Sequence, residues 1–121
     1  MELSLQNLLV FAPDLESARR FYGEVLGLNL VGTGESFLSF EGANFHLKVF
    51  SCEAPTQAER YSEEAGSSIA FSVSSLDAAV AQLTARGVRF LHSTPNEGTS
   101  GRYVAFVDPF GTVHELVQAH E

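Results

Sequence analysis

The chain has 121 residues, of which 15 are acidic and 7 are basic, so its formal net charge is −8 with the four histidines neutral. This balance argues against a nucleic-acid binder, because phosphate contacts need clustered lysine and arginine side chains. The length suits one domain, and a 45% share of hydrophobic residues with ten phenylalanines provides a buried core.

The single cysteine, Cys52, leaves no intramolecular disulfide, and the first residues lack the basic patch and apolar run of a signal peptide. No uncharged apolar stretch approaches the roughly 18–20 residues that a membrane-spanning helix requires. We therefore expect a cytoplasmic protein without a membrane partner.

The first half of the chain predicts one helix among four strands. An apolar run at 3–11 indicates a strand that ends at Pro13, and Asp14 can cap the helix that follows. Apolar residues recur at helical spacing from about Leu15 to Leu26, and Gly27 ends the helix. The further strands are predicted at 28–31, 36–40 and 44–50, with a tight connection at 41–42.

The same order returns after an acidic segment at 51–67, which predicts a linker with one helical turn around 57–64. Ser75 caps a second helix, and Gly87 closes it. The strands of this half are predicted at 68–73, 88–91, 102–107 and 113–119, with a polar loop at 92–101 and a turn at 108–111.

The two halves read as a duplication. The helix-opening residues Leu15 and Leu76 are 61 positions apart, and the closing residues Gly27 and Gly87 are 60 apart. Two copies of this length suggest paired modules rather than a solenoid. We therefore expect a single domain of two βαβββ modules, with module one at about 1–50, the linker at 51–67 and module two at 68–121.

Each module's helix covers one face of its strands, so the other faces are predicted to form a cup with the helices outside. This arrangement is an α+β fold with a mixed sheet. Alternation along the first strand places Leu5, Asn7, Leu9 and Phe11 on the cup side. In the last strand it places Glu115 and His114 on opposite faces, with His114 toward the helix or an interface.

Five segments carry a resemblance to the vicinal oxygen chelate superfamily: Asp14-Leu15, Phe21-Tyr22, Leu26-Gly27, Asp108-Pro109-Phe110-Gly111 and Glu115-Leu116. That superfamily includes glyoxalase I, extradiol dioxygenases and the bleomycin-resistance proteins, and the resemblance covers essentially the whole chain. It implies the same cup-shaped fold, a small organic ligand or substrate in the cup, and a homodimer.

The resemblance also locates four metal-ligand positions, which hold Asn7, His46, Ser68 and Glu115 here. His46 and Glu115 are good ligand types, whereas an asparagine amide is weak and a serine hydroxyl is poor. A catalytic divalent site usually needs three firm protein ligands, so the set predicts a degenerate metal site. If a metal is bound, the resemblance implies Zn, Ni, Mn or Fe held by Asn7, His46 and Glu115.

Lys48 bears on the same question. On a strand it shares a face with His46, with their Cα atoms about 6.5–7 Å apart. Its ammonium would repel a cation in the cup, and it would pair instead with Glu115 or with an anionic group of a ligand. Alternatively, its long stem carries the charge to solvent.

The candidate ligand contacts come from these positions and from aromatic side chains that alternation places toward the cup, although core packing also explains the aromatic residues. Glu115 is the candidate catalytic base. The ligand-contact candidates are Asn7, Phe11, His46, Lys48, Phe50, Ser68 and Tyr103.

Three functions stay open from the sequence. The first is a metal-free protein that binds a small organic ligand in the cup, as bleomycin-resistance proteins do. The second is a divalent-metal-dependent lyase, isomerase or dioxygenase of the glyoxalase I type. The third is metal-free acid–base catalysis by Glu115 and His46.

Overall fold

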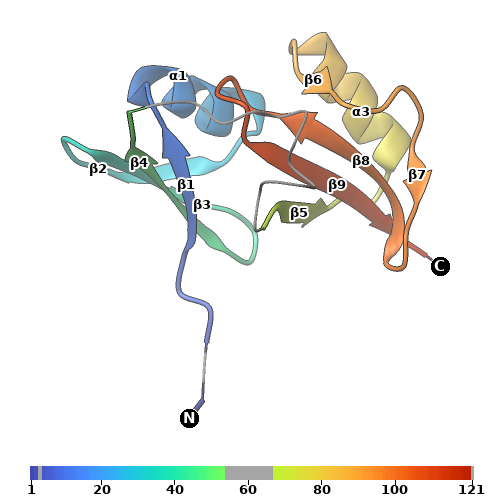
Figure 1. Cartoon of the computed structure of the whole chain (residues 1–121), viewed down its shortest axis with the longest axis horizontal. Helices are drawn as coiled ribbons and strands as arrows, with labels where there is room; N and C mark the ends of the chain where they lie inside the picture. Colours follow the sequence, from blue (N-terminus) through green and yellow to red (C-terminus); the bar gives the residue numbers. More distant parts are fainter. Residues whose placement is uncertain (3, 54–66, 121) are drawn as a thin grey trace. The chain divides into compact units, whose positions relative to one another are not determined.

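The computed structural model describes residues 1–2, 4–53 and 67–120 (Figure 1). The chain divides into two compact units, Met1–Pro55 and Thr56–Glu121, which we call unit 1 and unit 2. The helical turn predicted around 57–64 lies outside the described residues. None of the described helices is long and apolar enough to cross a membrane.

Unit 1 is a four-stranded mixed sheet with one helical segment. Its strand order is β1-β4-β3-β2, in which β1 runs parallel to β4 and the other neighbours are antiparallel. Its elements are β1 (Leu8–Ala12), α1 (Leu15–Arg19), the π-helix η1 (Arg20–Val25), β2 (Asn29–Thr33), β3 (Phe37–Glu41) and β4 (His46–Ser51).

Unit 2 repeats this arrangement. Its strand order is β5-β9-β8-β6, in which β5 runs parallel to β9, just as β1 runs parallel to β4 in unit 1. A short additional strand, β7, pairs with β8. Its elements are β5 (Ile69–Ser72), α3 (Leu76–Ala85), β6 (Arg89–Phe90), β7 (Asn96–Glu97), β8 (Gly101–Val107) and β9 (Val113–Ala119). The predicted α+β class with two βαβββ modules is confirmed, and only β7 was not predicted.

The predicted helix caps are present. The Asp14 carboxylate accepts the backbone N–H of Glu16 at 3.1 Å and the Ser17 hydroxyl at 2.7 Å. The Ser17 hydrogen bond lowers the pKa of Asp14 below its usual value. In unit 2 the Ser75 hydroxyl accepts the Ala78 N–H at 3.2 Å. These bonds satisfy N–H groups that have no partner inside the helix, so both helices begin where the sequence predicts.

The first helix differs from its prediction in its second half. The N–H of Leu26 donates to the carbonyl of Phe21, five residues back, at 2.9 Å, and Arg20–Val25 form a π-helix instead of continuing α1. Phe21 and Tyr22 are buried in this segment, and the Tyr22 ring lies 6.2 Å from that of Phe40. The apolar spacing predicts a helix here but does not distinguish the π form from the α form.

The first strand is shorter than the predicted 3–11. Leu8 pairs with Leu47, and β4 begins one residue earlier at His46. The connection before His46 closes tightly, with the Gly42 N–H donating to the Phe45 carbonyl at 2.9 Å. A strand needs a partner for its backbone groups, so the residues before Leu8 do not continue β1.

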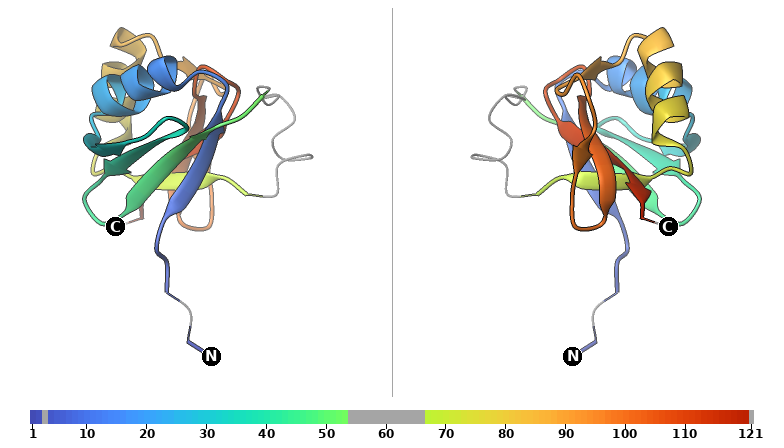
Figure 2. Two further views of the ribbon diagram at one scale, coloured as in Figure 1. Left: turned by 90° about the vertical axis from the view of Figure 1, so that its left-hand side faces the viewer. Right: turned by 90° about the vertical axis from the view of Figure 1, so that its right-hand side faces the viewer.

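The helical segments cover one face of each sheet. In unit 1, α1 contacts β3 and β4, and Figure 2 shows the helical segment along one side of these strands. The strand residues buried on this face alternate along the chain, as a period of two requires. They are Val10, Leu38, Phe40, Leu47 and Val49.

In unit 2, α3 contacts β9, and the residues that alternate with Glu115 form the covered face. His114 is 1% exposed, and its ring lies 5.7 Å from that of Phe71 and 5.5 Å from that of Phe106. Burial lowers the pKa of His114 to about 4. The prediction that His114 and Glu115 lie on opposite faces of the strand is confirmed.

A carboxylate organises the turn between β8 and β9. Asp108 is buried, and its Oδ1 accepts the backbone N–H groups of Phe110 and Thr112, each at 2.9 Å. Gly111 has a φ of 91°, which glycine adopts at little cost. The Asp108-Pro109-Phe110-Gly111 segment therefore sets where β9 begins, and with it the position of Glu115.

Candidate functional site

The unit 1 sheet has an open face opposite the covered one. In β1, Val10 is 3% exposed, whereas its neighbours Leu9 and Phe11 are 54% and 55% exposed. The same alternation continues in β4, where Leu47 and Val49 are buried and the residues that follow each of them, Lys48 and Phe50, are half-buried. We call this surface of β1, β4 and β3 the open face. It carries apolar side chains without the cover that a core residue has.

An aromatic row crosses one end of the open face. Phe11 of β1 pairs with Phe50 of β4, and Phe50 pairs with Phe37 of β3. The Phe11 and Phe50 ring centroids are 6.4 Å apart, and those of Phe50 and Phe37 are 6.2 Å apart. Both distances are within the range of favourable aromatic contacts. The sequence predicts Phe11 and Phe50 as ligand contacts, with Phe37 as a further aromatic candidate, and the register places Phe37 beside Phe50.

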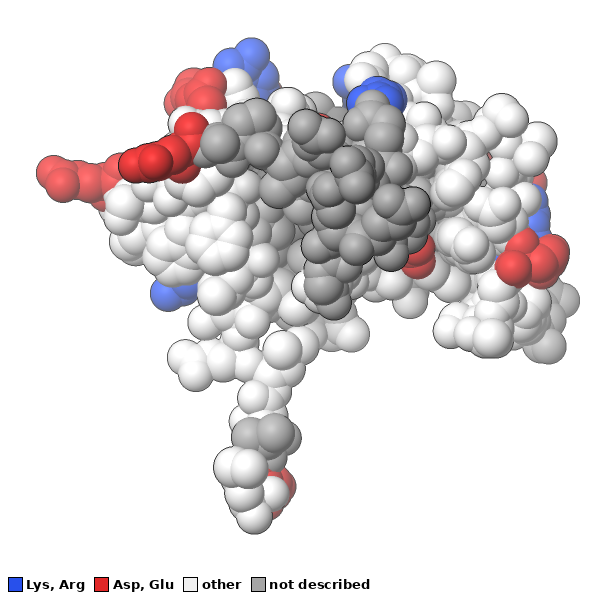
Figure 3. Space-filling view, viewed as in Figure 1, with Lys and Arg blue, Asp and Glu red and all other residues white. Residues whose placement is uncertain are grey.

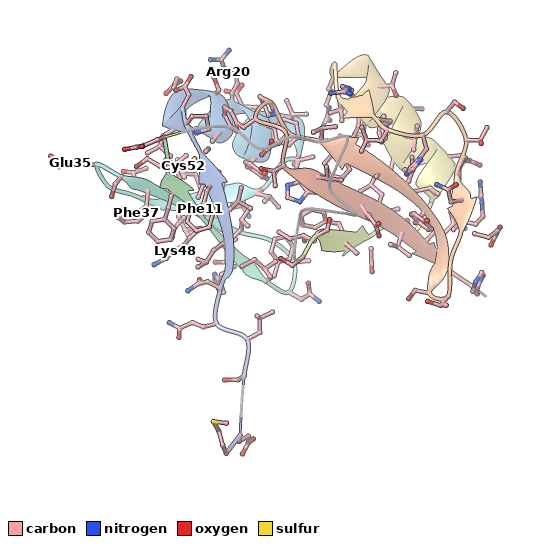
Figure 4. The ribbon with its side chains drawn as sticks, in the orientation of Figure 1. Phe11, Arg20, Glu35, Phe37, Lys48 and Cys52 are labelled. Atoms are coloured by element: carbon pink, nitrogen blue, oxygen red, sulfur yellow. The ribbon has the colours of Figure 1, made fainter. Side chains whose placement is uncertain are left out.

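The next row is formed by Leu9, Lys48 and Ser39, which are paired across the same strands. The Lys48 Nζ lies 5.5 Å from the centroid of the Phe37 ring, so the ammonium leans over the aromatic row (Figure 4). Among the described residues, no carboxylate is within ion-pair distance of this nitrogen. Lys48 is also the only lysine in the sequence.

A polar row crosses the other end of the open face. His46 of β4 pairs with Glu41 of β3, and both side chains are exposed. Asn7 directly precedes Leu8, the first residue of β1, and Leu8 pairs with Leu47, the residue after His46. Asn7 itself lies outside the strand, so the register does not pair it with His46. Glu41 was not predicted, because a tight connection at 41–42 makes it a turn residue, whereas in the structure the turn lies at 42–45 and Glu41 pairs with His46.

In unit 2, Glu115 is the polar residue on the face of β9 that alternates away from His114. Its partners in the sheet are Ala70 of β5 and Ala105 of β8, which leave its half-buried carboxylate without large neighbours on either strand. Tyr103 shares this face, because it lies two residues before Ala105 on β8. The sheet of unit 2 therefore presents a carboxylate and a phenol on the same face.

Two further side chains adjoin Tyr103. The ring of His92 meets it edge-on, with centroids 6.2 Å apart, and Asn96 of β7 is its partner in the sheet. Within the described part of the chain, the buried His92 Nε2 and Asn96 Nδ2 atoms have no hydrogen-bond partner. Sequence reasoning gave neither residue a role, because both fall in a polar stretch without periodicity.

Ser68 is engaged within its own sheet. Its hydroxyl donates to the carbonyl of Val113 at 2.7 Å, just before β5. This bond ties the start of β5 to the start of β9. The hydroxyl is therefore a structural donor as well as a predicted ligand contact.

The described residues of unit 1 do not form a divalent metal centre by themselves. His46 pairs with one firm carboxylate ligand, Glu41, while Lys48 brings a positive charge to the same face two residues along. No three His, Cys, Asp or Glu side chains of residues 1–2, 4–53 and 67–120 gather closely enough to hold an ion. Divalent sites in proteins favour several firm anionic or imidazole donors, and unit 1 alone supplies too few of them.

The comparisons with known proteins now decide the family. Residues 4–116 match the model of the Glyoxalase/Bleomycin resistance protein/Dioxygenase superfamily. The chain belongs to this superfamily. The predicted family is confirmed, and with it the fold.

Three proteins illustrate the similarity. The uncharacterized protein YwkD of Bacillus subtilis is 28% identical over 115 residues, which cover 88% of this chain and 89% of that protein. The fosfomycin resistance protein FosX of Listeria monocytogenes is 18% identical with a TM-score of 0.80, covering 99% of this chain and 94% of that one. TnmS3, an antibiotic binding protein of Streptomyces sp. CB03234, is 23% identical with a TM-score of 0.71, covering 99% of each chain.

Proposed function

We propose that this protein binds a small organic ligand on the open face of unit 1, and that its superfamily metal site is degenerate. The observation that carries the proposal is the aromatic row with the Lys48 ammonium beside it. Small-molecule sites are mostly apolar and contain a few polar groups that fix the ligand's orientation. The open face has this composition, with Phe11, Phe37 and Phe50 as the apolar part.

The polar side chains have proposed roles in the same scheme. His46 and Asn7 would hydrogen-bond polar atoms of the ligand at the end of the face opposite the aromatic row. Tyr103, Ser68 and Glu115 remain proposed ligand contacts on the sheet of unit 2. Glu115 is the residue that would act as a base if the ligand is also turned over.

Two proteins that share the fold support a small organic ligand. TnmS3 is an antibiotic binding protein, and FosX is a fosfomycin resistance protein. Both are therefore linked by name to organic molecules of low mass. For this chain we propose a bound small organic molecule in general, and we do not propose that it binds either antibiotic.

Metal analysis combined with ligand screening tests the proposal. Protein purified without chelator should contain well under one equivalent of Zn, Ni, Mn and Fe by inductively coupled plasma mass spectrometry. A screen of aromatic and polar organic compounds by thermal shift should find stabilising ligands, because a ligand at 100 times its Kd adds about 2.7 kcal/mol to the free energy of unfolding.

A matched pair of variants locates the site. Phe11→Ala should weaken the binding of a compound found in the screen, whereas Leu5→Ala should not, because Leu5 is exposed but lies outside the strands. One equivalent of metal, with turnover that both Glu115→Gln and chelation abolish, would instead establish the metal-dependent lyase, isomerase or dioxygenase. Equal affinity of both alanine variants would show that the ligand binds elsewhere.

A further inference from the structure

The charge and ring pattern of the open face defines a ligand class. We propose that the ligand is an aromatic molecule with an anionic group attached directly to its ring or one bond from it, as in an arene carboxylate. This inference rests on the proposed function and specifies its ligand. Three sets of observations on the open face carry it.

The first is the aromatic row. Three phenylalanine rings from three neighbouring strands lie in sequence, and the outermost, Phe11, is 55% exposed. Ring contacts of this kind favour a planar partner, since offset and edge-on contacts add to the area that each ring buries. An aliphatic ligand would gain the buried area alone. The row therefore selects for an aromatic ring.

The second is the isolated cation. Lys48 is the chain's only lysine, in a protein of net charge −8, and it lies on the open face with no carboxylate of the described residues in ion-pair distance. The described surface in Figure 3 shows charged groups scattered in that view, without a broad basic patch. A single ammonium supplies one strong charge-assisted hydrogen bond, which suits one anionic group.

The third is the spacing of the rows. Lys48 and Phe50 are two residues apart on β4, a rise of roughly 6.5–7 Å, yet the Nζ reaches back to within 5.5 Å of the Phe37 centroid. An anionic group that contacts the Lys48 ammonium must therefore lie close to the ligand's own ring when that ring packs on the aromatic row. On the other side of Lys48 stands the polar row with the Glu41 carboxylate, which would repel an anion on a long tether.

The proposal is tested with three probes that share one ring. 2-Naphthoate, 2-naphthylmethanol and 2-naphthylmethylammonium are titrated into the full chain by isothermal calorimetry. 2-Naphthoate should bind tightest and the ammonium compound weakest. The affinity of 2-naphthoate should also fall as salt is added, because its contact with Lys48 is partly exposed to solvent.

Variants connect the preference to Lys48. Lys48→Met keeps much of the apolar stem and should weaken 2-naphthoate by about tenfold, while leaving 2-naphthylmethanol unchanged. Lys48→Arg should restore most of the affinity. Arg19→Met removes an equal charge from the exposed side of α1 and should have no effect. The unfolding midpoint of Lys48→Met checks that this variant is folded.

The single lysine also gives a direct readout. Reductive methylation with 13C-formaldehyde labels the Lys48 amine and the N-terminal amine, and the Lys48 signal should shift when 2-naphthoate binds and stay in place with acetate. This measurement reports on the amine itself.

Five outcomes would overturn the proposal. Equal affinity for the acid and the alcohol, or no effect of Lys48→Met, would show that the ligand class is wrong while small-molecule binding stands. Binding of other screen compounds but of none of the naphthyl probes would have the same meaning. Failure of every compound would overturn the proposed function too. A shift from dimer to monomer in Phe11→Ala, seen by light scattering, would show that a second copy covers the face.

Discussion

At the scale of single residues, His114 gives the protein a defined response to acid. Burial between the Phe71 and Phe106 rings lowers its pKa from 6.5 to about 4. Between these values the unfolded chain binds a proton that the folded chain does not bind. The free energy of unfolding should therefore fall as the pH is lowered from about 6.5 toward 4, by at most about 1.4 kcal/mol per pH unit from this group.

Urea unfolding followed by circular dichroism at several pH values measures this dependence. His114→Leu should flatten the curve in that window, whereas His120→Leu, which changes an exposed residue, should leave it as it is. If the native chain has the same free energy of unfolding at pH 6.5 and pH 5, His114 does not act as described.

At the scale of elements, the π-helix η1 can be tested by deletion. Its i to i+5 hydrogen bond accommodates one residue more than an α-helical turn. Deleting the exposed Glu24 should convert the segment to an α-helix and keep the cap and the end of the helix in place. Deleting the exposed Gln82 from the α-helix α3 should be far more destabilising, because it rotates the buried Leu83 off its face.

Thermal unfolding of the two deletion variants measures the difference. We expect a cooperative transition for the Glu24 deletion and a much lower midpoint, or loss of folding, for the Gln82 deletion. Equal losses would mean that the π turn is required where it lies.

Most elements follow from local patterns. The cap at Asp14, the closing Gly27 and the alternation of apolar residues lead directly to β1, the first helix and its covered face. The short strand β7 has only two residues, which is too few for a periodic pattern to predict it. The π form of η1 is not predicted either, because the apolar spacing indicates a helix without specifying its hydrogen-bond pattern.

The candidate site was predictable where it depended on alternation. His46 was predicted from the family pattern, and alternation along β4 places it on the same face as Lys48 and Phe50. Phe37 and Glu41 depend on which strands are neighbours and in what register, and this pairing is decided by long-range contacts. The same is true of His92 and Asn96 beside Tyr103. The predicted cup, which needs both sheets, stays a prediction.

At the scale of the whole molecule, we predict a homodimer, as the family resemblance implies. β2 ends the strand order of unit 1, and its Val31 is 55% exposed. An edge strand with exposed apolar residues favours pairing with another chain. Light scattering should give twice the chain mass of 13.1 kDa.

A charge on this edge provides the matched test. Val31→Lys should shift the mass toward that of one chain, because a lysine on an edge strand opposes pairing. Thr33→Lys adds the same charge at an already polar position of β2 and should have a smaller effect. A single-chain mass for the native protein at micromolar concentration would contradict the dimer.

The π-helix also accounts for a difference in length between the helical segments of the two units. Gly27 follows Leu15 by 12 positions, whereas Gly87 follows Leu76 by 11, although the two units share strand order and parallel pairing. The one-residue difference falls inside the first helical segment, where η1 absorbs it. The π turn therefore lets unit 1 hold one residue more than unit 2 between the helix-opening leucine and the closing glycine, while the strand that follows still starts at the same place in the strand order.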